Sequence, residues 1–169
     1  ICTDDALSSL DPAVGPDRIV PLRKEEQLCA SRALGVSETV FLDYTDMGLK
    51  FSDELWLRIT RLVRRVRPHI LMMFDPWLRY ELHPDHSAAA RAAWYAQLAA
   101  ANAWKFPELL QKEKLQPWQV SELYLFKPDA PDTWVDIEDA LPAKARALAC
   151  HRSQFEWLAT DQGRGVDLL

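Results

Sequence analysis

The chain has 169 residues, and its 49% of hydrophobic and 27% of charged residues are the composition of a globular protein with a buried core. Its formal net charge of −5 argues against a protein that binds the phosphate backbone of a nucleic acid. No apolar run approaches the roughly 20 residues that cross a bilayer, so no membrane span is expected.

The beginning of the chain predicts one helix between two short strands. Residues 1–3 have the pattern of a strand end, and residues 4–21 form a loop that contains Pro, Gly and Asp. Residues 22–34 carry helical apolar spacing and stop at Gly35, a common residue just beyond a helix C-terminus. The apolar run 39–42 then predicts a short strand.

The rest of the chain continues this alternation. The pattern predicts, in order, a helix over 53–67, a strand over 69–74, a helix over 84–103, strands over 120–126 and 133–137, and a helix over 139–159. Pro68 ends the first of these helices, whose arginines are expected to form a solvated face. The run HILMMF at 69–74 is continuously apolar, which is typical of a strand buried on both faces.

This alternation predicts the fold class, an α/β sandwich with a mostly parallel central sheet, in one domain over residues 1–169. Right-handed crossovers place the loops that follow the strands at one edge of such a sheet, where ligands bind. The loops DYTDMG and DPWLRYELHPDH each follow a predicted strand, so we expect both at this edge. The chain begins with Ile1, and ICTDD reads as the end of a buried strand, so the first βα unit is expected to be missing.

The cysteines give an expectation about the compartment. Cys2, Cys29 and Cys150 are widely spaced and odd in number. This pattern argues against a disulfide framework and favours a reducing compartment, so a cytoplasmic location is expected. No CxxC is present, which argues against a zinc site made of thiolates.

The stretch HPDH at 83–86 lies where an alanine-rich helix is predicted to begin. Pro and Asp are ordinary residues for a helix start, so the spacing alone leaves a polar helix start and a metal or catalytic site both open. Three features favour the site. The loop follows the most apolar strand, a helix N-terminus disfavours a protonated imidazole, and Asp75 and Asp85 are available to hold imidazole N–H groups.

Five stretches match one known family in order. They are ICTDD, LRKEEQLCASRALGV with Arg23 and Glu26, VFLDYTDMGL with Asp46 and Gly48, RPHILMMFDPWLRYELHPDH, and VDIEDALPAKARALACHRSQF. On these motifs the chain resembles the LmbE-like, or GlcNAc-phosphatidylinositol de-N-acetylase (PIG-L), family of zinc-dependent N-deacetylases. The resemblance implies a Rossmann-like three-layer sandwich whose first strand carries a His-Pro-Asp-Asp motif that is not found in this sequence.

The resemblance also implies roles for residues of this chain. His86 is implied as a zinc ligand, the third beside a histidine and an aspartate of the His-Pro-Asp-Asp motif. His83 corresponds to a histidine that stabilises the tetrahedral intermediate, and Asp85 corresponds to its orienting partner. Some members of the family carry a tyrosine two residues before this histidine that helps to hold the oxyanion, whereas this sequence has Glu81 there. Arg23 corresponds to an arginine at the substrate mouth. The expected substrate contacts are Arg23, Asp46 and Asp75.

The expected function is a metal-dependent hydrolase that removes an N-acetyl group from an N-acetylglucosamine-type substrate through a zinc-activated water. Zn²⁺ is the expected metal, with Fe²⁺ or another divalent ion left open. The expected partners are a small amino-sugar conjugate and further copies of the chain in a homo-oligomer. The chain alone is expected to be inactive. Two alternatives stay open: a degenerate, non-catalytic member that binds a sugar or a partner protein, and a purely structural HPDH helix start.

Overall fold

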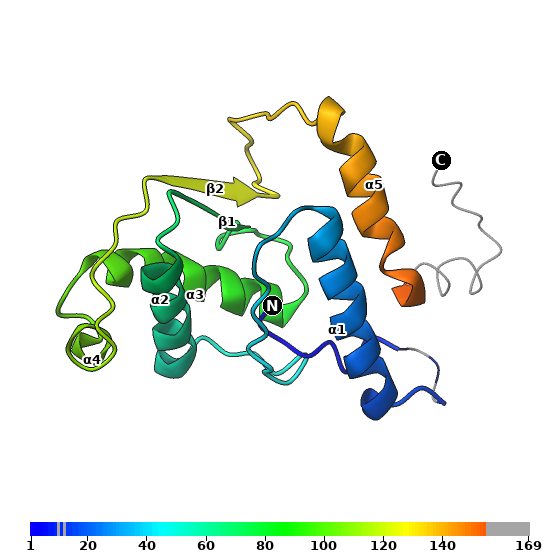
Figure 1. Cartoon of the computed structure of the whole chain (residues 1–169), viewed down its shortest axis with the longest axis horizontal. Helices are drawn as coiled ribbons and strands as arrows, with labels where there is room; N and C mark the ends of the chain where they lie inside the picture. Colours follow the sequence, from blue (N-terminus) through cyan, green and yellow to red (C-terminus); the bar gives the residue numbers. More distant parts are fainter. Residues whose placement is uncertain (10, 12, 155–169) are drawn as a thin grey trace. The chain divides into compact units, whose positions relative to one another are not determined.

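The computed structural model describes residues 1–9, 11 and 13–154, and it shows an α/β protein with a parallel sheet. The chain divides into two compact units (Figure 1). The helical unit consists of Ile1–Asp46 and Trp134–Leu169, and the sheet unit consists of Met47–Thr133. The single domain over 1–169 stays a prediction. Among the described residues, no helix combines the length and the apolar character that a membrane span requires.

The helices of the helical unit differ in extent from the prediction. Its described residues form α1 (Pro16–Ala33), the 3₁₀ helix η1 (Glu138–Ala140) and α5 (Leu141–Ala149). α1 begins at Pro16 because a proline at the first helical position lacks only an N–H that has no helical partner. It runs through Pro21, which the sequence pattern placed in a loop. Beyond residue 154, the predicted helix 139–159 lies outside the described residues.

Two extended segments of the helical unit lie parallel where strands were predicted. The Ile1 amino group donates to the Val40 carbonyl at 2.8 Å, and Thr3 and Tyr44 form an isolated parallel bridge. Asp5 and Asp43 have φ angles of 58° and 55°, so neither can continue an extended strand. The pairing therefore stays too short to count as a strand.

The predicted strand over 133–137 is absent from the structure. Trp134 and Val135 are 79% and 69% exposed, and no described strand pairs with this segment. Its β-branched and aromatic composition resembles that of a strand, but a strand needs a partner for its backbone groups. The segment instead leads into η1.

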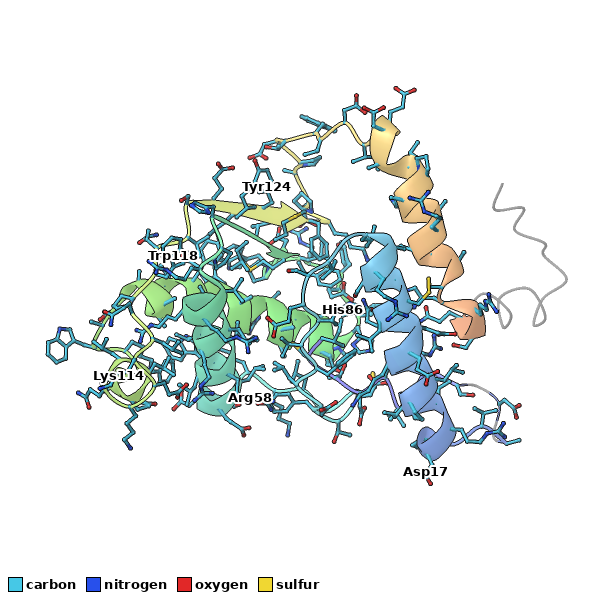
Figure 2. All side chains as sticks on the ribbon, viewed as in Figure 1. Asp17, Arg58, His86, Lys114, Trp118 and Tyr124 are labelled. Atoms are coloured by element: carbon cyan, nitrogen blue, oxygen red, sulfur yellow. A yellow bond between two sulfur atoms is a disulfide. The ribbon has the colours of Figure 1, made fainter. Side chains whose placement is uncertain are left out.

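A disulfide joins Cys29 of α1 to Cys150 at the end of α5, visible as the yellow bond between the two helices in Figure 2. The expectation of no disulfide is therefore wrong. The two residues are 121 positions apart in the sequence, and the packing of α5 on α1 brings their Cα atoms to 5.7 Å. This lies within the range that a disulfide spans. Cys2 is not part of a disulfide.

The sheet unit contains the parallel sheet. Its elements are α2 (Asp53–Val66), β1 (Ile70–Phe74), α3 (Pro84–Ala101), α4 (Pro107–Gln111) and β2 (Glu122–Phe126), of which α4 was not predicted. β1 and β2 pair in parallel, with Ile70 opposite Glu122 and Phe74 opposite Phe126. α2 begins as predicted, because the Ser52 hydroxyl accepts the Leu55 N–H.

The prediction that β1 is buried on both faces is wrong. Met73 is only 5% exposed, whereas Met72 and Ile70 on the other face are 66% and 49% exposed. The covered face packs on a cluster centred on Val63, Ala100 and Val120, which joins α2 and α3 to the start of β2. Successive side chains of a strand point to opposite faces, so packing against one face buries only every second residue.

The expectation that the arginines of α2 form a solvated face is wrong for Arg64. The side chain is 1% exposed and donates from Nη2 to the Asn102 carbonyl at 2.6 Å and from Nε to the Ala100 carbonyl at 3.2 Å. These carbonyls belong to the C-terminal end of α3, whose last four carbonyls have no partner within the helix. Burial lowers the pKa of Arg64. The arginine therefore links α2 to α3.

Candidate functional site

The start of α3 carries the HPDH stretch (Figure 2 labels His86). His83 is the N-cap residue and has an extended backbone, and Pro84 follows at the first helical position. The His83 Nδ1 atom accepts the backbone N–H of Asp85 at 3.3 Å, which satisfies a donor at the helix start. A ring nitrogen that accepts a hydrogen bond carries no proton. In neutral His83 the proton is therefore on Nε2.

Asp85 is buried and holds a neighbouring loop. Its two carboxylate oxygens accept the Met47 N–H at 2.8 Å and the Leu49 N–H at 3.0 Å. A carboxylate oxygen of Asp85 and a ring nitrogen of His83 also lie within 4.8 Å of each other. The structure therefore brings together the pair that the sequence analysis named, and it adds an anchoring contact that no sequence pattern signalled. The orientation of His83 by Asp85 stays a prediction.

His86 lies between two aromatic rings. It stacks on Phe74 at the end of β1, with ring centroids 4.5 Å apart, and on His83 at 4.6 Å. The side chain is 41% exposed, yet its Nδ1 atom is buried. This Nδ1 lies 3.2 Å from Oε1 of Glu81, without the alignment of a hydrogen bond.

Glu81 was missed as a site residue. Its Oε1 accepts the backbone N–H of His83 at 3.0 Å in addition to its approach to His86. The His83 N–H lowers the pKa of Glu81, and His86 and Lys127 act in the same direction. The signal in the sequence was its position two residues before the HPDH stretch, where the family resemblance placed a tyrosine.

Asp75 lies directly after β1. Its backbone N–H donates to the Phe126 carbonyl at 3.2 Å, which extends the pairing of β1 with β2 by one residue. Its carboxylate accepts the Trp77 N–H at 2.8 Å and so shapes the turn that leaves the sheet. Asp75 therefore sits at the carboxyl edge of the sheet, as predicted from the order of the elements. Its contact with a substrate stays a prediction.

The helical unit holds Arg23 and Asp46, the other two predicted substrate contacts. Arg23 is 8% exposed, and its Nε and Nη1 atoms make no hydrogen bond with any described residue. Nε lies 3.3 Å from the Asp5 carboxylate, and Nη1 lies 3.8 Å from that of Glu26. Asp46 is also buried and accepts the Leu7 N–H at 3.1 Å.

A cavity of about 160 Å³ lies beside Arg23 in the helical unit. Lys24, Asp4 and Asp5 also line it, together with His151 and Gln154. The sequence pattern assigns no chemical role to His151 or Gln154. Glu26 holds their segment in place, because its carboxylate accepts the N–H and the hydroxyl of Ser153 at 2.8 and 2.7 Å.

The fold matches that of a solved deacetylase and that of a second solved protein. The structure superposes on an N,N'-diacetylchitobiose deacetylase from Pyrococcus horikoshii with a TM-score of 0.85 and 29% identity, covering 91% of this chain and 58% of that one. The conserved protein TT1542 from Thermus thermophilus matches with a TM-score of 0.67 and 29% identity, covering 80% of this chain and 59% of that one.

The chain belongs to the GlcNAc-PI de-N-acetylase (PIG-L) family, whose model matches residues 2–97. A diacetylchitobiose deacetylase from Thermococcus kodakarensis is 31% identical over 92% of this chain and 58% of that protein. A 1D-myo-inositol 2-acetamido-2-deoxy-alpha-D-glucopyranoside deacetylase from Streptomyces scabiei is 32% identical over 66% and 39%. The chain thus spans between about two fifths and three fifths of these relatives' lengths. The resemblance inferred from the motifs is confirmed.

Proposed function

We propose that the protein is a metal-dependent N-deacetylase that acts on a small conjugate of N-acetylglucosamine. Membership of the PIG-L family and the names of the relatives support this proposal. The observation that carries it is the arrangement of the HPDH stretch, in which His83 and His86 stack at the start of α3, beside the end of a parallel strand. Ligands of α/β proteins bind at that edge of the sheet.

The donor set at His86 fits a divalent metal. A ligand histidine must be neutral, with one nitrogen free and the other N–H held by an acceptor. The buried Nδ1 lies 3.2 Å from the Glu81 carboxylate, which is close enough to accept its N–H after a small rotation of the ring, and this leaves Nε2 as the ligand atom. We propose Zn²⁺, with Fe²⁺ as the alternative that an imidazole also suits. When bound, such a metal supplies an activated water at neutral pH.

The residues of this chain would then have distinct roles. His86 binds the metal. His83, whose Nδ1 is engaged by a backbone N–H, presents Nε2–H as a donor to the oxyanion of the tetrahedral intermediate. Asp85 fixes the position of the helix start through its bonds to the loop at 47–49. Arg23, Asp46 and Asp75 are the proposed substrate contacts.

Further features of the proposal concern the intact protein. We infer a Rossmann-like three-layer sandwich, a homo-oligomer, and metal ligands supplied by a His-Pro-Asp-Asp segment that is not among the 169 residues. The 169 residues by themselves would then be inactive. A cytoplasmic location also stays a prediction. It requires the Cys29–Cys150 disulfide to resist reduction there, which thiol labelling of the protein from cell extracts tests.

The test is deacetylation by the intact purified protein, measured as release of free amine from N-acetylglucosamine conjugates that include diacetylchitobiose. His86→Ala should lose the metal and the activity, and His83→Ala should keep the metal and lose activity by about 10²–10³-fold. His69→Gln is the matched control, because this histidine packs against Trp118 elsewhere in the sheet unit. Activity in His86→Ala equal to wild type would refute the proposal.

The second candidate is a non-catalytic member that binds a sugar. The replacement of the family tyrosine by Glu81 favours it, because one oxyanion donor of some members is then lacking. Metal analysis of the intact protein separates the two candidates. The absence of bound metal from the intact protein, together with no turnover of any acetylated amino sugar, would support the binding function.

A further inference from the structure

We propose that Glu81 is a positioning residue that holds the imidazole of His86 in the orientation and tautomer that bind the metal. The inference rests on the proposed function and adds a residue for which neither the sequence pattern nor the family resemblance supplied a role. It depends on three observations around the start of α3: one shared carboxylate oxygen, one buried ring nitrogen, and the stacking of the His86 ring on two neighbouring rings.

The carboxylate of Glu81 serves two groups with the same oxygen. Oε1 accepts the His83 N–H at 3.0 Å and lies 3.2 Å from Nδ1 of His86. The Glu81 side chain is 12% exposed, so little water competes for this oxygen. The contact to the His83 N–H fixes the carboxylate to the backbone at the helix start. A carboxylate fixed in this way provides a stable reference for the His86 ring.

The His86 ring has few other ways to be oriented. Its Nδ1 is buried and makes no aligned hydrogen bond within the described residues, so the exposed part of the ring lies on its other atoms. Stacking on Phe74 and His83 fixes the plane of the ring, with interplanar angles of 15° and 24°. Stacking does not distinguish the two ring nitrogens, whereas a carboxylate beside one of them does.

The chemical consequence follows from the tautomer. An anionic acceptor beside Nδ1 favours the proton on Nδ1 and leaves the Nε2 lone pair for a metal. A small rotation within the stack brings Nδ1–H into line with Oε1, and such hydrogen bonds are often poorly aligned until the site is occupied. Carboxylates in this position typically raise metal affinity by about 10–100-fold.

A merely structural role for Glu81 predicts something different. If Glu81 only accepted the His83 N–H, Gln would replace it, because the amide oxygen accepts that bond equally well. Glu81→Gln removes the charge beside Nδ1 and keeps the size and the acceptor. The variant therefore separates support of the helix start from orientation of the metal ligand.

The experiment measures Zn²⁺ affinity of the intact protein by competition with a chromophoric chelator, together with thermal unfolding of the metal-free form. Glu81→Gln should weaken Zn²⁺ binding by about 10–100-fold while the Tm of the metal-free protein stays unchanged. Saturating Zn²⁺ should return most of the deacetylase activity. Glu122→Gln is the matched control, since the exposed side chain of Glu122 accepts a hydrogen bond from the Tyr124 hydroxyl, and its replacement should leave the affinity unchanged.

Wild-type Zn²⁺ affinity in Glu81→Gln overturns the inference. If His86→Ala loses Zn²⁺ while Glu81→Gln does not, only the role of Glu81 fails and the proposed function stands. If the intact wild-type protein binds no Zn²⁺, or if the intact His86→Ala variant binds Zn²⁺ as tightly as wild type, both the inference and the proposed metal site fail.

Discussion

Asp5 illustrates at the level of a single residue how burial and charge compete. Burial raises the pKa of its carboxyl, and the nearby Arg23 guanidinium opposes this rise without cancelling it. An acid whose pKa is raised by folding stabilises the folded state when it is protonated. This contribution is present below the unfolded pKa and is lost as pH rises through the higher folded value.

We therefore expect Asp5→Asn to become more stable relative to wild type as pH rises from about 3 to 6, because the neutral amide cannot ionise. Urea unfolding of both proteins across this range measures the difference in free energy. Asp132→Asn, in an exposed loop, is the control. A difference that does not change with pH would show that Arg23 fully compensates the burial.

Arg64 and Arg61 lie on the same helix and differ in their surroundings. Arg64 is buried and donates to carbonyls at the end of α3, whereas Arg61 forms an exposed pair with Glu113. Arg64→Met should cost about 2–4 kcal/mol, because several carbonyls lose a charged donor in a buried place. Arg61→Met should cost at most about 1 kcal/mol. Equal losses of unfolding free energy in the two variants, measured with denaturant, would contradict the role of Arg64 as a donor to the α3 carbonyls.

At the scale of the elements, β1 has one covered and one exposed face although its sequence is apolar throughout. Met73→Ala should cost about 2–5 kcal/mol, since its side chain is nearly inaccessible on the face that the helices cover. Met72→Ala, at the preceding residue on the opposite face, should change the free energy of unfolding by less than about 1 kcal/mol because that face is exposed. Denaturant midpoints of the two variants check this. A large loss for Met72→Ala would mean that the exposed face is covered in the intact protein.

The disulfide between α1 and α5 gives a second prediction at this scale. Replacing Cys29 and Cys150 together by Ser should lower the free energy of unfolding by about 2–5 kcal/mol, because the unfolded chain regains the freedom of a long loop. Thermal unfolding with and without a dithiol measures it. Wild type should fall to the level of the double variant when reduced, and the double variant should not respond. If the dithiol also lowered the stability of the double variant, its effect would not come from this disulfide.

At the scale of the whole molecule, the proposed metal site leads to a prediction of how tightly this chain by itself holds zinc. A catalytic zinc takes three protein ligands, and the family resemblance assigns one of them, His86, to this sequence. We therefore expect the 169-residue chain to lose Zn²⁺ during dialysis, with a metal content far below one ion per chain. Elemental analysis after dialysis measures this. Tight, stoichiometric zinc on these residues would contradict the assignment.

Much of the fold and part of the candidate site followed from the sequence. Local signals were enough for the start of α2 at residue 53, the start of α3 at Pro84, and the strand before the HPDH stretch. The HPDH motif and four further matching stretches also identified the family, since such motifs depend on residue type and spacing alone. Helix starts and motifs are encoded within a few neighbouring residues, so they are visible in a sequence.

Only the tertiary structure decided the features that join distant parts of the chain. The Cys29–Cys150 disulfide, the burial of Arg64 under the end of α3 and the single covered face of β1 all depend on which segments pack together. The approach of Glu81 to the His86 ring depends on side-chain conformation in a loop. Spacing along the chain encodes periodicity and local hydrogen bonds, but the partner of a buried charge or thiol is fixed only when the chain has folded.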